Sequence, residues 1–190
     1  MKTNLETELT YFILGLPNNG TTIVASLFNS LDDGFCICEP HWYVERGHAI
    51  EDVGAGCCGK VAHLWDQADV RELREIYPGF VLPATVIGGY HLGGYKETWR
   101  NDALGNRLLR DHVGRVDFFV VVHRHDSDFL RDLGSHHKAV NVEYDEFRLD
   151  PLAHVNAALA GRFEIEGPVV LQPTGWKFGD PRANRSTEVT

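Results

Sequence analysis

A strand, a glycine-containing turn and a helix follow one another between residues 9 and 31, and this arrangement constrains the fold more than any other feature of the chain. The run from Leu9 to Leu14 is apolar, favours a strand and ends at Gly15. Residues 15–20 have turn chemistry, and from Thr21 to Leu31 the apolar side chains recur at helical spacing. The sequence therefore predicts a buried strand, a tight loop and a helix with one apolar face.

The loop has the residue spacing of a phosphate-binding loop. Gly15 and Gly20 are spaced as in a Walker A loop, and Thr22 takes the place of its serine or threonine. Glycines let successive backbone N–H groups face one point, and the start of the helix adds the positive end of its dipole. Thr21 stands where an NTPase has lysine, which argues against an ordinary ATPase or GTPase. We therefore expect an anion to be held by Pro17, Asn18, Asn19, Gly20, Thr21 and Thr22.

The rest of the chain alternates between apolar strands and helices. We expect strands at 35–38, 80–86, 116–122, 139–142 and 169–171, and helices at 61–76, 98–112, 127–133 and 151–159. Residues 116–122 are apolar enough to lie in the middle of a parallel sheet. The glycine-rich residues 87–95 are expected at the surface, beside an acceptor pocket. The alternation predicts an α/β fold, with a central, mainly parallel sheet flanked by helices, in one domain spanning 1–190.

Composition excludes several classes of protein. The formal net charge is −9, from 27 acidic and 18 basic residues, whereas a general nucleic-acid binder carries a basic excess. No apolar run reaches the length of about 18 residues that suggests a membrane-spanning helix. The first residues lack the layout of a signal peptide, so a reduced, cytoplasmic protein is expected. A zinc site is a less favoured alternative to buried thiols for Cys36, Cys38, Cys57 and Cys58.

The loop and the residues after it resemble the opening of the sulfotransferases that use 3′-phosphoadenosine-5′-phosphosulfate. The pattern Gly-x-Pro-x-x-Gly-Thr-Thr starts at Gly15 and ends at Thr22, and Glu39-Pro40 follows the second expected strand. Four later segments resemble the family in the same order: 94–97, 120–124, 142–151 and 179–186. The resemblance covers most of the chain and implies a three-layer P-loop fold of the sulfotransferase kind.

The same resemblance implies the cofactor and the way in which it is held. Residues 17–22 would bind the 5′-phosphosulfate of 3′-phosphoadenosine-5′-phosphosulfate. Arg124 would bind the 3′-phosphate, together with Arg182 and Arg185 of a C-terminal segment, 174–190, that closes over the cofactor. The sulfuryl group would pass to a hydroxyl or amine of a small-molecule or glycan-like acceptor, leaving 3′-phosphoadenosine-5′-phosphate.

Three residues are candidates for the chemical step. Lys96 would stabilise negative charge on the transferred group, and its alternative role is a surface ion pair with Glu97. Glu39 or His41 would deprotonate the acceptor; the alternatives are a structural carboxylate and a solvated imidazole. For Arg124 the alternative is a salt bridge to Asp126 or Asp128. No metal is required, because such catalysis depends on positioning and electrostatics.

Departures from the family pattern leave two other functions open. Asn18 stands where the family has a cation beside the transferred group, and Asp132 stands where it has a serine. A catalytically degenerate relative that binds a nucleotide or a protein partner would fit both departures. A small-molecule phosphotransferase is the third hypothesis, disfavoured by Thr21 in the lysine position. The acceptor and the oligomeric state do not follow from the sequence.

Overall fold

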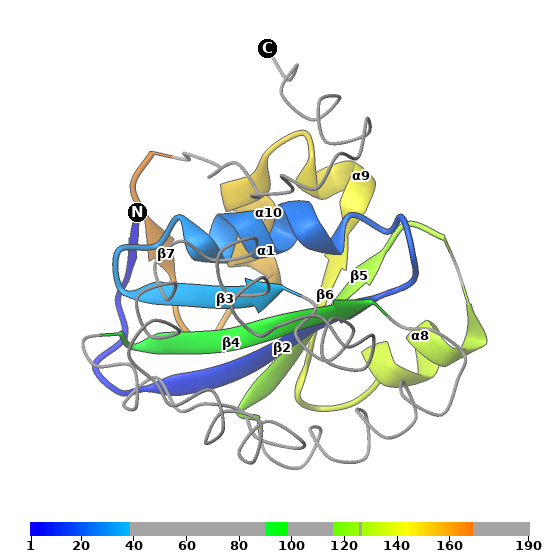
Figure 1. The fold of residues 1–190 in the computed structure, drawn as a ribbon, viewed down its shortest axis with the longest axis horizontal. Helices are drawn as coiled ribbons and strands as arrows, with labels where there is room; N and C mark the ends of the chain where they lie inside the picture. The colour runs from blue at the N-terminus through cyan, green and yellow to red at the C-terminus, as the bar shows by residue number, and fades with distance from the viewer. Residues whose placement is uncertain (39–89, 99–115, 126, 169–190) are drawn as a thin grey trace, which may run out of the picture.

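The fold is an α/β arrangement built on a parallel sheet. The computed structural model describes residues 1–38, 90–98, 116–125 and 127–168 (Figure 1). Five strands in the order β3-β4-β2-β5-β6 form the sheet, and all neighbouring strands are parallel. They are β2 (Leu9–Gly15), β3 (Gly34–Cys38), β4 (Leu92–Thr98), β5 (Phe118–His123) and β6 (Ala139–Glu143). The prediction of an α/β fold with a mainly parallel sheet is confirmed.

Helices flank this sheet, and a small second sheet joins the chain's first residues to later ones. The helices are α1 (Thr21–Asn29), α8 (Asp128–Gly134), α9 (Tyr144–Phe147) and α10 (Pro151–Ala158). Two short strands, β1 (Lys2–Thr3) and β7 (Ile165–Glu166), pair antiparallel. Within the described ranges, no helix is long and apolar enough to cross a membrane.

Strand β2 is buried on both faces because it lies in the centre of the sheet. Tyr11 and Ile13 face α1, whereas Phe12 and Leu14 face the opposite side, and all four side chains are at most 1% exposed. This double burial explains why the segment is continuously apolar rather than alternating. The strand therefore provides a rigid base for the loop that follows it.

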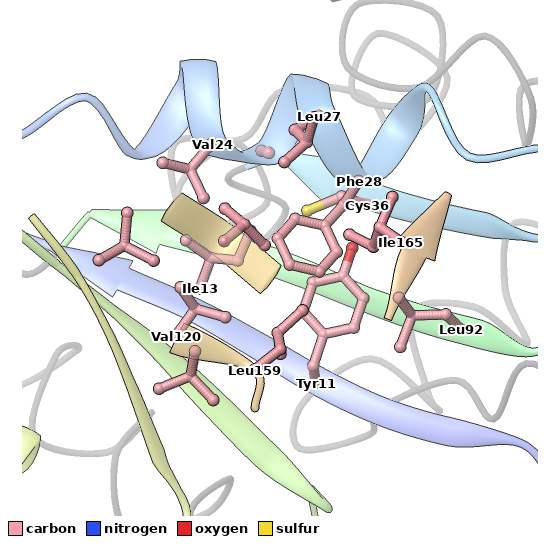
Figure 2. Close-up of a cluster of buried hydrophobic side chains, with 14 of the residues drawn as sticks. Tyr11, Ile13, Val24, Leu27, Phe28, Cys36, Leu92, Val120, Leu159 and Ile165 are labelled. Carbon is pink, nitrogen blue, oxygen red and sulfur yellow. The ribbon is translucent and has the colours of Figure 1, made fainter. Parts of the chain in front are cut away.

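The core on the α1 face joins the two halves of the sheet. Figure 2 shows Phe28 of α1 lying over Tyr11 of β2, and their ring centroids are 4.7 Å apart. The buried hydroxyl of Tyr11 donates a hydrogen bond to the carbonyl of Phe35, at 2.8 Å. Leu159, which directly follows α10, packs into the same cluster. Packing of α1 against this face of β2 thus holds the helix on the sheet and fixes the loop that connects them.

Strand β4 corrects an expectation. The residues 92–95 are not a surface segment beside an acceptor pocket, because they form a buried strand between β3 and β2. A Cβ atom on Gly94 would lie 2.3 Å from the backbone oxygen of Tyr11. Gly94 permits close packing of neighbouring strands inside the sheet. It does not form the turn that the glycine-rich sequence suggested.

The starts of helices α8 and α10 are set by capping residues close to them in the sequence. Ser127 caps α8 by accepting a hydrogen bond from the N–H of Leu130, and Asp150 caps α10 in the same way from Ala153. Helix α9, a single turn, is not predicted from the sequence. Thr98 was expected to begin a helix, but it is the last residue of strand β4. The expected helix at 61–76, the expected strands at 80–86 and 169–171 and the rest of the expected helix, 99–112, lie outside the described residues.

Candidate functional site

The loop between β2 and α1 lies at the carboxyl edge of the sheet, where the strand order changes direction. Strands β3 and β4 lie on one side of β2, and β5 and β6 lie on the other. Ligands of open parallel sheets bind at such a position, outside the carboxyl ends of the strands. Figure 1 shows the loop rising from the end of β2 to α1, close to α9. The fold thus places the predicted anion loop where a ligand site is expected.

The loop leads into the first turn of α1, where backbone N–H groups lack partners within the helix. A hydrogen bond from the N–H of Asn19 to the carbonyl of Leu16, at 3.1 Å, closes a turn. Asn18 and Gly20 have positive φ angles of 67° and 87°. The N-cap residue, Gly20, has no side chain that could cap the helix, and the first-turn N–H groups of Thr21 and Thr22 have no acceptor within the helix. These groups and the helix dipole can bind an anion.

Asn19 holds the loop against β5. Its side chain is fully buried, and its Nδ2 donates a hydrogen bond to the carbonyl of Val122, at 2.8 Å. Its Oδ1 accepts one from the N–H of His125, at 3.2 Å. Both side-chain bonds and the bond from its N–H to Leu16 are made within the protein, so the described contacts of Asn19 hold the loop in place. The exposed residues of the loop are Pro17 and Asn18.

Arg124 and Tyr144 complete the described surroundings of the loop. The Nη1 of the exposed Arg124 donates a hydrogen bond to the carbonyl of Asn18, at 3.1 Å. Its guanidinium carbon lies 4.8 Å from the centroid of the Tyr144 ring. That ring also packs on Gly20, where a Cβ atom would come within 2.1 Å of it. Loop, β5 and α9 thus meet at one place, beside the start of α1.

The alternative salt bridge of Arg124 is not made with Asp128, because Asp128 pairs with Arg131 instead. Asp126 lies outside the described residues. Tyr144 was not singled out from the sequence, where it stands only as one residue of a segment that resembles the family. The ring that covers Gly20 comes from a residue 124 positions further along the chain, and no local pattern indicates such a contact.

Lys96 is buried within the sheet and does not lie on the surface. It pairs in register with Ile13, and only 1% of it is exposed; its neighbour Glu97 is 2% exposed. Consecutive strand residues face opposite sides of a sheet. The surface position that the alternative role of Lys96 requires is therefore wrong, since Lys96 and Glu97 are both buried. Lys96 lies two residues before Thr98, which pairs with Gly15 at the base of the loop.

Four predicted site residues lie outside the described residues: Glu39, His41, Arg182 and Arg185. The structure therefore brings together the residues of the loop and Arg124, and it places Lys96 in a strand next to β2.

A hollow of about 590 Å³ lies beside Arg124, at the carboxyl ends of β5 and β6. It is lined by His123, Arg124, Arg131, Gly134, Ser135, Asn141 and Glu143. Of these residues only Arg124 was predicted as a site residue. His123 and Asn141 both lie on the sheet face opposite α1, since they alternate with the core residues Val122 and Val142. The alternation of side chains between the two faces of a strand is thus the sequence signal that would have placed His123 and Asn141 on the same face of the sheet.

Comparisons of the chain with protein-family models, with curated proteins and with solved structures gave no match. The assignment of a function therefore depends on the geometry of the loop and the residues around it.

Proposed function

We propose that the loop from Gly15 to Thr22 binds the phosphate end of an anionic nucleotide, and that the protein is a sulfotransferase-like enzyme. The proposed donor is 3′-phosphoadenosine-5′-phosphosulfate, and the acceptor is a hydroxyl or amine of a small molecule or a glycan. One observation carries the proposal: the loop ends at the first N–H groups of α1, where the N-cap residue Gly20 has no side chain, at the carboxyl edge of the sheet.

The proposed reaction is an in-line transfer. The acceptor oxygen or nitrogen forms a bond to sulfur, and the bond from sulfur to the oxygen of the 5′-phosphate breaks. The electron pair leaves with 3′-phosphoadenosine-5′-phosphate, and the acceptor's proton passes to a base, for which Glu39 and His41 remain the candidates. Residues 17–22 would hold the 5′-phosphosulfate, and Lys96 would offset charge on the transferred group.

Arg124 supports the same proposal at the other end of the nucleotide. It is an exposed cation whose hydrogen bond to the backbone carbonyl of Asn18 places it close to the loop proposed for the 5′-phosphate. Its proposed ligand is the 3′-phosphate of the same nucleotide. Arg182 and Arg185 would join it on the 3′-phosphate if residues 174–190 close over the cofactor. The finer architecture that this function implies, a three-layer P-loop fold, is part of the proposal.

A titration with 3′-phosphoadenosine-5′-phosphate tests this proposal, with ADP and ATP plus Mg²⁺ as comparators. A ligand present at 100 times its Kd stabilises the folded state by about 2.7 kcal/mol. For a chain of this size we expect the Tm to rise by roughly 5 to 11 °C. Stabilisation by the 3′-phosphorylated nucleotide alone would support the sulfotransferase proposal. A preference for ATP would favour the phosphotransferase, and no response to any nucleotide would contradict binding by the loop.

The second candidate function is a degenerate relative that binds a nucleotide or a protein partner without catalysing transfer. Asn18 favours it, because an exposed asparagine brings no charge to the position where the family has a cation. The variant Asn18→Arg separates the two functions in an assay of sulfuryl transfer. Large activity that arises only in the variant would indicate a degenerate protein, whereas activity already present in the natural chain would support the enzyme.

A further inference from the structure

Helix α10 holds a histidine against the backbone at the start of α9. His154 belongs to α10, and its side chain is 16% exposed. Its Nε2 accepts a hydrogen bond from the backbone N–H of Glu143, at 3.0 Å. Glu143 is the last residue of β6 and directly precedes α9 (Figure 1). The ring therefore fixes the backbone at the point where the strand ends and the helix begins.

This contact reaches the anion loop through the next residue. Tyr144 follows Glu143, and its ring covers Gly20, where a Cβ atom would come within 2.1 Å of it. The same ring lies 4.8 Å from the guanidinium carbon of Arg124, which donates a hydrogen bond to the loop backbone. A short series of contacts thus connects the ring of His154 to the loop.

The bond to the backbone requires a neutral ring. A backbone N–H can only donate, so the Nε2 of His154 carries a lone pair and the hydrogen of the neutral ring lies on Nδ1. The Nδ1 lies 3.3 Å from a carboxylate oxygen of Glu146, which is placed to accept that hydrogen. Protonation adds a hydrogen to Nε2, and this hydrogen would face the N–H of Glu143. The charged ring consequently loses the bond to the backbone.

The charged side chains around His154 do not replace this bond. Helix α10 has no other charged residue, and it packs against α9 and β6. The charged side chains of α9, of the end of β6 and of the residues that lead into α10 are all exposed: Glu143, Asp145, Glu146, Arg148 and Asp150. Asp145 pairs with Arg148, and Asp150 caps α10. Glu146 lies beside Nδ1, so it attracts the charged ring without restoring the bond at Nε2.

We propose that His154 is a positioning residue for the anion loop: its neutral ring holds Tyr144 over Gly20, and protonation of the ring releases this contact. Histidine is the side chain that ordinarily changes its charge between about pH 5 and 8. Because the bond belongs to the neutral ring, its contribution is present at the upper end of this range and is lost as the pH falls. The effect on nucleotide affinity rests on the proposed function, whereas the effect on the loop does not.

NMR of the full chain without a ligand tests the effect on the loop. As the pH falls from about 8 to about 5.5, the amides of Glu143, Tyr144 and Gly20 should shift together with the ring signals of His154. In His154→Gln the amide oxygen can accept the backbone bond and does not titrate, so these amides should lose that transition. The proposal is overturned if the transition persists in His154→Gln, or if the amides of Tyr144 and Gly20 do not follow the ring in the natural chain.

The affinity for 3′-phosphoadenosine-5′-phosphate measures the consequence for the site. Phosphate monoesters gain a proton at about pH 6, so the variants are compared with the natural chain at the same pH. At about pH 8, His154→Gln should bind as tightly as the natural chain and His154→Leu about 2- to 10-fold more weakly, because one hydrogen bond is lost. At about pH 5.5 the natural chain should bind about 2- to 10-fold more weakly than His154→Gln. Equal affinities of the three proteins at both pH values would contradict the positioning role.

His137→Gln is the matched control, because it removes a histidine near the other end of β6. His137 is exposed, and its backbone carbonyl, which accepts a hydrogen bond from Arg162, is kept in the variant. The variant should keep the pH profile of the natural chain, and loss of the profile would contradict the assignment to His154. If the nucleotide binds at neither pH, the proposed function fails, while the amide shifts of the free chain still decide the role of His154. If His154→Leu does not fold, the comparison of His154→Gln with the natural chain decides.

Discussion

Replacing Gly20 by alanine is expected to lower the free energy of unfolding by about 2–5 kcal/mol. This loss adds the cost of a left-handed backbone at a residue with a Cβ atom to the cost of a steric clash. Gly20 has a φ of 87°, and an added Cβ would lie 2.1 Å from the ring of Tyr144. The ring must move, and its contact with Arg124 moves with it. Because the start of α1 would be displaced as well, the variant should also lose nucleotide binding. Urea unfolding and the calorimetric titration measure the two effects.

Gly161 provides a matched control for this prediction. It has a φ of 82°, and nothing lies within 4 Å of the position that its Cβ would take. Gly161→Ala should therefore show only the backbone cost of about 1–2 kcal/mol and should bind nucleotide normally. Adding Tyr144→Ala to Gly20→Ala should recover part of the lost stability. Equal effects of the two glycine substitutions would show that the packing of Tyr144 on the loop is unimportant.

Replacing Asn19 by alanine is expected to cost about 2–4 kcal/mol of the free energy of unfolding, because a buried carbonyl loses its donor and a small cavity remains. The fully buried side chain bridges Val122 and His125, which belong to the end of β5 and the residues after it. Removing the bridge should detach the loop from the strand. Hydrogen exchange at the amide of His125 should accelerate, and nucleotide affinity should fall.

Asn18→Gly is the control for Asn19→Ala within the same loop. Asn18 is exposed and has a φ of 67°, a conformation that glycine adopts without strain. Its bond to Arg124 uses the backbone carbonyl, which the substitution preserves. The variant should keep the stability and the His125 exchange rate of the natural chain. If Asn19→Ala behaved like Asn18→Gly, the buried amide would not be what fixes the loop.

Local signals determined a large part of this protein. The apolar run before Gly15 and the helical spacing after Thr21 predicted β2, the loop and α1 close to their observed bounds. The caps of α8 and α10 also follow from single residues, Ser127 and Asp150, because a cap bonds to a backbone group three residues away. Such interactions act over a few residues, so the sequence alone displays them.

Tertiary contacts decided what the site residues do. Gly94 looked like a turn residue, yet it lies in a central strand where Tyr11 leaves no room for a side chain. Asn19 looked like a ligand contact, yet its amide bonds to Val122, 103 residues away. The hollow assembles Arg131 with residues of two strands that adjoin only in the sheet. Strand pairing and burial set these roles, and both depend on residues distant along the chain, so no local pattern announced them.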